Sequence, residues 1–171
     1  MSNKQDLRFV KTERLIIDTY LELKTRNQSP VKVSDLCAAA LINKSTFYAH
    51  YETMEDLHDK VCKLTISKML SEAPGNELVF TDTRVFVESI VKTLQKNKAF
   101  LDMLFGNNRI KEINAVEHYI LDTRLYDVES EDIKMEFLFA IGGAARLLVF
   151  DQSQDRIEKA IQLIQRVLDK H

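Results

Sequence analysis

The residues that cross-link or interrupt a chain are scarce in this sequence of 171 residues. Its two cysteines, Cys37 and Cys62, are too few and too lightly patterned for a disulfide framework or a zinc cluster, so we expect a reducing, cytoplasmic environment. The two prolines and four glycines mark only a few breaks, among them a turn at residues 27–30 and an interruption at residues 74–76. No uncharged apolar run approaches the roughly 18 residues that a membrane span requires.

Sustained period-two alternation is also missing, so we expect no sheet. Apolar residues recur instead at helical spacing along most of the chain, which predicts an all-α protein of about nine helices. Hydrophobic residues make up 45% and charged residues 29%, an ordinary globular composition. The first six residues lead into a charged segment without an apolar core, so we expect no signal peptide.

The net charge of -2 hides an uneven distribution of charge. Residues 1–51 contain eight Lys and Arg against five Asp and Glu, a balance of +3, and the other 120 residues therefore sum to -5. A mildly basic N-terminal part on an acidic remainder is compatible with a nucleic-acid partner. The indication is weak, because a few surplus charges often mean only a solvated surface.

Three short segments near the N-terminus have the pattern of a helix-turn-helix. Residues 11–26 predict a first helix that Thr12 caps, and Ser34 is the predicted N-cap of a second, short helix. Asn43 is the predicted N-cap of a third, in which Phe47 and Tyr51 share one face. The core stripe of the first helix is expected to comprise Leu15, Ile16, Thr19, Tyr20 and Leu23.

Further helices follow to the C-terminus. Thr53 and Asp56 predict a capping box that opens a helix reaching about residue 73. Three shorter helices are predicted around residues 85–94, 100–105 and 110–121. The second is expected to end at Gly106 and the third near Tyr126. Ser130 is the predicted cap of a long helix, and a final helix covers residues 157–168. Gly142 and Gly143 each cost roughly 1 kcal/mol in a helix interior, so close approach of another helix is expected there.

The segment from residue 33 to 57 carries a family resemblance, above all in Ser45-Thr46-Phe47-Tyr48-Ala49-His50-Tyr51 and the following Glu55-Asp56-Leu57. It resembles the DNA-binding signature of the TetR/AcrR family, in particular a branch related to dihydroxyacetone kinase regulators, over residues 8–64. The resemblance implies a homodimeric transcriptional regulator. We assign residues 1–54 to a DNA-binding domain and residues 55–171 to a helical domain that dimerises and holds an effector.

By position in the motif, the resemblance implies which side chains meet DNA. Lys44 and Ser45 would reach base edges, Thr46 and Tyr48 bases or phosphates, and His50 a phosphate, which suits their donor and acceptor groups. The predicted DNA-contacting set is completed by Ser34, Arg8 and Lys11. The residues expected to anchor the recognition helix are Asn43, Phe47 and Tyr51.

Two positions depart from the commonest pattern of the family. Leu41 stands where many members have glycine, so the turn should avoid a positive φ or incur its cost. Met54 stands where many members have a lysine aimed at a phosphate, so one charged contact is missing, and Arg8, Lys11 or Lys32 gain importance.

Two sites are expected in the second domain. A small-molecule pocket, if one exists, should be lined by Phe86, Phe100, Met103, Phe105, His118, Tyr119 and Phe137. The last two helices either pack only within the chain or also pair with a second copy as a four-helix interface. The predicted dimer interface comprises Phe137, Ile141, Gly142, Ala145, Leu148, Ile157, Ile161, Ile164 and Leu168.

The leading hypothesis is a homodimeric repressor that binds a palindromic operator and is released when an effector tilts residues 55–73. The alternative is a helical, dimeric protein-interaction module whose DNA binding is weak or lost. An enzyme is disfavoured, since His58 and Cys62 lie four residues apart without a nearby third metal ligand, and no nucleophile–base set or phosphate loop appears. We therefore expect no cofactor and no metal.

Overall fold

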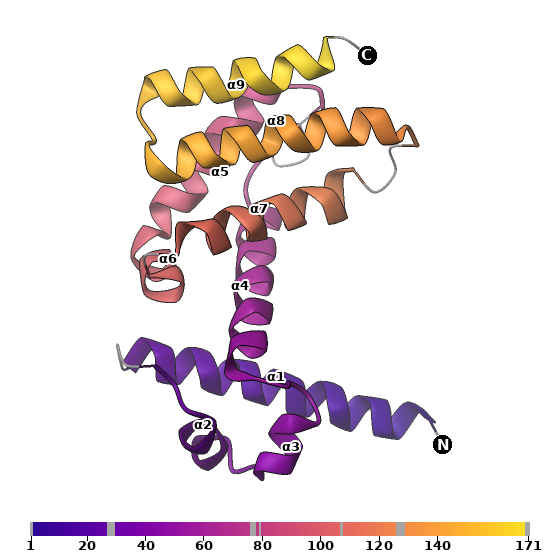
Figure 1. Cartoon of the computed structure of the whole chain (residues 1–171), viewed down its shortest axis with the longest axis vertical. Helices are drawn as coiled ribbons and strands as arrows, with labels where there is room; N and C mark the ends of the chain where they lie inside the picture. The colour runs from indigo at the N-terminus through magenta and orange to yellow at the C-terminus, as the bar shows by residue number, and fades with distance from the viewer. Residues whose placement is uncertain are drawn as a thin grey trace. The chain divides into compact units, whose positions relative to one another are not determined.

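The computed structural model describes residues 2–26, 30–75, 78, 80–106, 108–125 and 129–169. The predictions for residues 27–29, Asn76 and Tyr126 lie outside these ranges. Nine helices and no strand occur in the described residues, so the predicted all-α fold is confirmed (Figure 1). Within them no helix is both long and apolar enough to cross a membrane.

The chain divides into two compact units, residues 1–61 and 62–171. The boundary falls inside helix α4 (Met54–Ser71), a few residues after the domain boundary that we expected between residues 54 and 55. The first unit contains α1 (Ser2–Arg26), α2 (Val33–Ala39), α3 (Lys44–Tyr48) and the beginning of α4.

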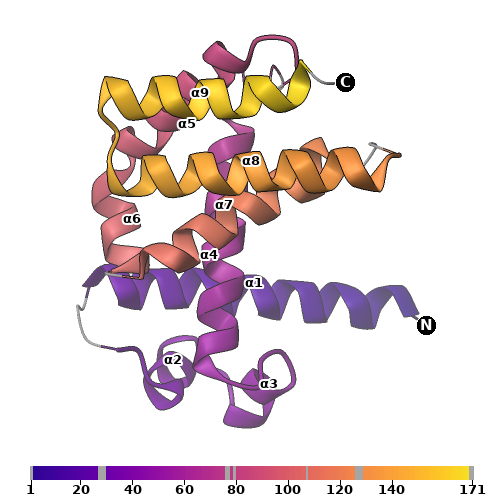
Figure 2. The ribbon, with the colours of Figure 1, turned by 45° about the horizontal axis from the view of Figure 1, so that its top comes forward.

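Helix α1 begins nine residues earlier than predicted and runs without interruption to Arg26 (Figure 2). The expected cap, Thr12, is therefore wrong: it lies inside the helix, where its hydroxyl donates to the Arg8 carbonyl at 2.9 Å. Leu15 was expected in the core but is 44% exposed. Ile16 and Tyr20 are buried as predicted and, with Leu36, Phe47 and Leu57 from the other three helices, form the core of this unit.

The three remaining cap predictions of this unit have different outcomes. The capping box is confirmed, since Thr53 N donates to Asp56 Oδ2 at 2.8 Å and Asp56 N to Thr53 Oγ1 at 3.1 Å. Asn43 occupies the N-cap position of α3, but its side chain forms no capping hydrogen bond. The prediction that Ser34 caps α2 is wrong, because the helix begins at Val33 and Lys32 occupies the N-cap position. The Ser34 hydroxyl donates to Asp35 Oδ1 instead.

The second unit contains the end of α4 followed by α5 (Thr83–Lys96), α6 (Lys98–Phe105), α7 (Arg109–Arg124), α8 (Glu131–Phe150) and α9 (Gln154–Leu168). Helices α8 and α9 form an antiparallel hairpin, with α7 against α8 and α5 against α9 (Figures 1 and 2). The Ser130 cap is confirmed, because its hydroxyl accepts from Ile133 N, and α6 ends at Gly106, which has a φ of +56°.

The two adjacent glycines of α8 lie where neighbouring helices approach closely, as predicted. A Cβ atom on Gly142 would lie 2.6 Å from Glu117 Oε1 of α7, and one on Gly143 would lie 2.9 Å from Leu163 Cδ2 of α9. Both approaches occur within one chain. The contact with α7 and α9 thus offsets the low helix propensity of the two glycines.

Candidate nucleic-acid interface

Helix α3 is only five residues long and depends on its anchors for stability. Phe47 is fully buried and Tyr51, just after the helix, is 7% exposed, so both contact the core as predicted. On the opposite side Lys44 and Ser45 are exposed, and Tyr48 is 54% exposed. One buried side and one polar side leave α3 with a surface on which donors and acceptors are open to a partner.

Thr46 and His50 are less accessible than the resemblance implies. Thr46 is half-buried. The His50 ring stacks on Phe9 of α1 with a centroid distance of 3.8 Å and an interplanar angle of 26°. His50 Nδ1 is buried without a hydrogen-bond partner, so only Nε2 is left for a phosphate.

A second contact from α1 holds the same end of the recognition helix. The Tyr51 hydroxyl donates to Glu13 Oε1 at 3.2 Å, and Glu13 lies one helical turn after Phe9. Burial, followed by the negative charge of Glu13, raises the pKa of Tyr51 above its ordinary value. Helix α1 therefore fixes the two residues that follow α3 with one aromatic and one polar contact.

The turn between α2 and α3 has the one positive φ found at a described residue other than glycine. Leu41 has a φ of 54°, and its side chain is 92% exposed. Ile42 N donates to the Cys37 carbonyl at 3.0 Å across this residue, which is the hydrogen bond of a Schellman ending. The turn therefore keeps the geometry that glycine favours, although a leucine occupies the position.

The remaining residues of the predicted DNA-contacting set lie on α1 and α2. Ser34 is exposed on α2. Arg8 and Lys11 are exposed on α1, and neither of them forms an ion pair within the described part of the chain. Lys32 is also exposed, next to the start of α2. Met54 is half-buried at the start of α4 and supplies no charge.

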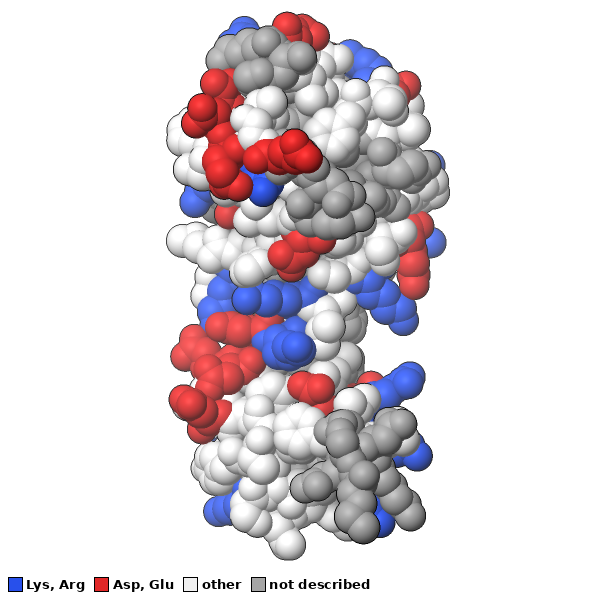
Figure 3. Space-filling model, turned by 90° about the vertical axis from the view of Figure 1, so that its right-hand side faces the viewer, with Lys and Arg blue, Asp and Glu red and all other residues white. Residues whose placement is uncertain are grey.

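The charge of this unit is balanced. Residues 1–61 contain nine Lys and Arg and nine Asp and Glu, because Glu52, Glu55, Asp56 and Asp59 follow the recognition segment. On the face in Figure 3, basic and acidic side chains are interspersed with uncharged areas. Because the unit has no net positive charge, its attraction to phosphates depends on individual basic side chains and not on its total charge.

The predicted effector-pocket residues lie in different environments in the described ranges. Of that set, Phe86 lines a small apolar cavity of about 40 Å³ in the second unit. Tyr119 and Phe137 are core residues, and Phe137 packs on Phe80 at a centroid distance of 5.2 Å. His118 is exposed beside Asp122. Phe100 and Met103 are half-buried, and Phe105 is buried.

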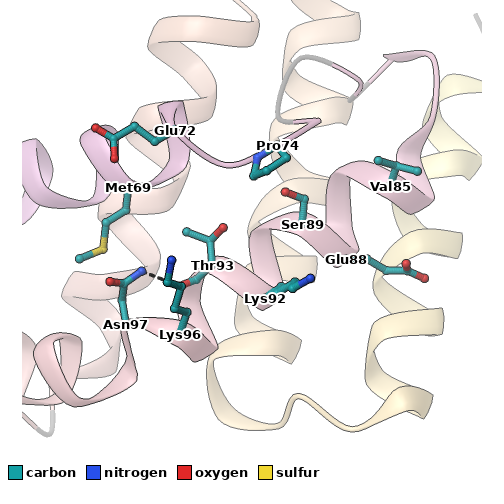
Figure 4. Close-up of a pocket in the computed structure, with 10 residues that line it drawn as sticks. All are labelled: Met69, Glu72, Pro74, Val85, Glu88, Ser89, Lys92, Thr93, Lys96 and Asn97. Atoms are coloured by element: carbon teal, nitrogen blue, oxygen red, sulfur yellow. Dashed lines mark hydrogen bonds between the residues drawn. The ribbon is translucent and has the colours of Figure 1, made fainter.

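A larger opening of about 620 Å³ lies between the end of α4 and α5 (Figure 4). The sequence reasoning missed it. Its polar side comes from α5. The hydroxyl residues Ser89 and Thr93 lie one turn apart on this helix, and so do Lys92 and Lys96. That repetition on the polar face of a helix is a signal that could have indicated the groove.

Most of the predicted dimer-interface residues are buried inside the single chain. Only Leu168 of that set is half-buried, and the fully packed members are Phe137, Ile141, Gly142, Ala145, Leu148, Ile157, Ile161 and Ile164. These side chains form the contact of α8 with its neighbours and have little surface left for a partner. The exposed apolar side chains of α8 are Met135, Phe139 and Phe150.

His58 accepts or donates a hydrogen bond through Nδ1 with the Tyr20 hydroxyl at 2.9 Å. Among the residues that the structure describes, no group of three or more His, Cys, Asp and Glu could hold a metal ion.

The chain was compared with protein-family models, with curated proteins and with solved structures. No family model, curated protein or solved structure matches it.

Proposed function

We propose that this protein is a DNA-binding transcriptional regulator that places α3 in the major groove. The observation that carries the proposal is the exposure of Lys44, Ser45 and Tyr48 on a short helix whose other side is buried. The resemblance of residues 33–57 to the TetR/AcrR signature supports the same function. A cytoplasmic location belongs to this proposal.

In this proposal α3 reads bases and its surroundings bind the DNA backbone. Lys44 donates to guanine acceptors, while the Ser45 hydroxyl and the Tyr48 hydroxyl serve bases or phosphates. Thr46 and His50 Nε2 add further contacts, and Arg8, Lys11 and Ser34 meet phosphates beside them. The methionine at position 54 removes one phosphate contact, so each remaining cation contributes a larger share of the affinity.

The regulator acts as a homodimer on a palindromic operator, because two copies of α3 can then occupy half-sites about one turn of DNA apart. The surface proposed for self-association is the exposed apolar side of α8, with Met135, Phe139 and Phe150. A repressor released by a small-molecule effector is the form of regulation that the resemblance favours.

A protein-interaction module with weak or lost DNA binding is the second candidate. The balanced charge of residues 1–61 and the uncharged Met54 favour it. Salt dependence separates the two candidates, because neutralised phosphates give a log-affinity slope of roughly -0.9 per contact on B-DNA. A binding partner whose affinity hardly changes with salt would support the interaction module.

The proposal is tested by fluorescence anisotropy with duplexes enriched by the purified protein from a random pool. We expect Tyr48→Ala to weaken binding at least tenfold, and Lys44→Ala to weaken it and lower the salt slope by about 1. The matched control is Lys92→Ala, because Lys92 is also exposed and unpaired but lies in the second unit. Enrichment of no duplex, or unchanged affinity in both α3 variants with intact circular dichroism, would contradict the proposal.

A further inference from the structure

Helix α5 has two distinct sides, and only one belongs to the core. Phe86 and Ile90 are buried and line the small apolar cavity, and Leu94, one turn later, is also buried. The opposite side of α5 opens into the groove of about 620 Å³, whose other wall is the end of α4. That volume falls within the roughly 300–1,000 Å³ of typical small-ligand sites. The groove is open to solvent and separate from the predicted effector pocket.

Two hydroxyl groups on this side of α5 have no hydrogen-bond partner within the described residues. Ser89 Oγ is buried and unpaired, although a buried hydroxyl normally finds an acceptor. Thr93 uses its backbone carbonyl to accept from Asn97 Nδ2 at 2.8 Å, the contact dashed in Figure 4, and leaves its hydroxyl unused. Thr93 and Ser89 lie one turn apart on the side of α5 that lines the groove (Figure 4). The Thr93 hydroxyl can donate to an acceptor there, and the buried Ser89 hydroxyl can do so after rotation about its single side-chain bond.

The charged groups around the groove favour an anion. Lys92, Lys96, Glu72 and Glu88 all line the groove. Lys96 directs its ammonium toward the space between the two helices, whereas the charged ends of Lys92 and Glu88 lie on the side of α5 away from α4 (Figure 4). Lys96 forms no ion pair with a described residue, and Glu88 is already bound by Arg84 at 3.4 Å. One unpaired cation beside two unused donors is a suitable site for a carboxylate.

The remaining wall of the groove supplies apolar surface. Met69 of α4, Pro74 after it and Val85 at the start of α5 line the groove, and Val85 is exposed to solvent. A molecule with a hydrocarbon part could cover these side chains while its charged end stays near Lys96. Burial of that hydrocarbon part would add affinity to the ionic contact.

We propose that the groove between α4 and α5 binds a small amphipathic carboxylate. The carboxylate lies at the Lys96 ammonium and accepts from the Thr93 and Ser89 hydroxyls, the latter after rotation about its single side-chain bond. The hydrocarbon part lies along Met69, Pro74 and Val85. This assignment does not depend on DNA binding, since every residue in it belongs to the second unit.

The test uses decanoate below its micelle concentration as the probe and the full chain labelled with ¹³C at the methionine methyl groups. We expect saturable shifts of the Met69 signal, identified with a Met69→Leu variant, and no shift of Met135 on α8. Decyltrimethylammonium, which has the same chain and the opposite charge, should bind at least tenfold more weakly. Acetate, which lacks the chain, should also bind at least tenfold more weakly.

Lys96→Gln should weaken decanoate binding about tenfold, whereas its control Lys63→Gln should change it less than twofold. Both are exposed lysines of the second unit, Lys63 lies on α4 and does not line the groove, and circular dichroism can verify that both variants fold. The proposal is overturned if decanoate causes no saturable shift at Met69, if the ammonium probe binds equally well, or if the two lysine variants lose equal affinity.

Discussion

Leu41 shows how a single residue can conflict with the conformation that its neighbours require. The Schellman ending of α2 needs a positive φ at this position, and leucine takes it at 54° although its side chain makes almost no compensating contact. A left-handed conformation costs an L-residue other than glycine roughly 1–2 kcal/mol. The turn therefore retains its geometry at the expense of stability.

Replacing this leucine tests that cost directly. Leu41→Gly should raise the free energy of unfolding by about 1 kcal/mol, because glycine adopts the same φ without strain while little packing is lost. The measurement is urea denaturation followed by circular dichroism. Leu41→Ala keeps the unfavourable φ and should stay within about 0.5 kcal/mol of the original protein. A gain in the alanine variant as large as in the glycine variant would contradict this explanation.

Tyr51 anchors the recognition helix through burial and through its hydrogen bond to Glu13. Because its pKa in the folded protein is raised above the ordinary value of 10.0, the folded state holds the hydroxyl proton more tightly than the unfolded state. The resulting stabilisation is fully present below pH 10 and is lost as the pH rises from there toward the folded-state pKa.

We therefore expect Tyr51→Phe to change the alkaline stability profile. At pH 7 the variant should lose about 1 kcal/mol, the usual contribution of one hydrogen bond. Between about pH 10 and 12 the difference should shrink, since phenylalanine cannot titrate whereas the tyrosine loses its proton on unfolding. Denaturant titrations at several pH values measure both proteins. Parallel profiles across this range would show that Tyr51 does not titrate differently on folding.

At the scale of elements, the hairpin of α8 and α9 depends on small residues at the helix contact. At Gly143 a Cβ atom would lie 2.9 Å from Leu163 Cδ2, so the leucine, which packs α9 on α8, would have to shift. At Gly142 the nearest atom is the carboxylate oxygen of Glu117, the free end of a flexible side chain. The two glycines thus have different tolerance for substitution although they are adjacent in sequence.

Gly143→Val should destabilise the second unit by about 1–3 kcal/mol, because the added methyl groups push α9 away from α8. Gly142→Ala is the control: Glu117 can move aside, and the better helix propensity of alanine should offset the loss of its weak contact with Arg146. Thermal and urea denaturation compare the two variants. Equal effects of both substitutions would argue against close packing of α8 on α9 at Gly143.

For the whole molecule, the proposed dimer depends on the exposed side of α8. Phe139 is 85% exposed, although a phenylalanine would ordinarily be buried, and Met135 and Phe150 lie on the same helix with similar exposure. An apolar surface of this kind marks an interaction site in many soluble proteins.

Light scattering after gel filtration should give about twice the chain mass of 19.8 kDa for the original protein and a monomer for Phe139→Asp. A charge in a desolvated apolar interface is costly, and association should fail. Ile110→Asp is the control, since Ile110 is a comparably exposed apolar residue on α7. A monomeric original protein, or a dimer that survives Phe139→Asp, would contradict the proposed surface.

The sequence alone determined the features that depend on short-range pattern. Helical periodicity predicted the all-α fold, and Thr53 with Asp56, Ser130 and Gly106 marked helix ends that the structure confirms. The glycine pair of α8 predicted close helix approach. Caps failed where a helix extended further, as at Thr12, because nothing in a local pattern forbids an earlier start.

Only the tertiary structure decided which surfaces remain available. His50 was expected to be free for a phosphate, but its ring lies against Phe9, 41 residues away in sequence. Helix α8 is apolar on several sides, so its sequence could not show that Phe137 would be buried and Phe139 exposed. The groove beside α5 forms only when the end of α4 is brought next to it. Burial and pocket formation depend on contacts between residues distant in sequence, whereas helix formation and capping depend mainly on neighbours within a turn or two.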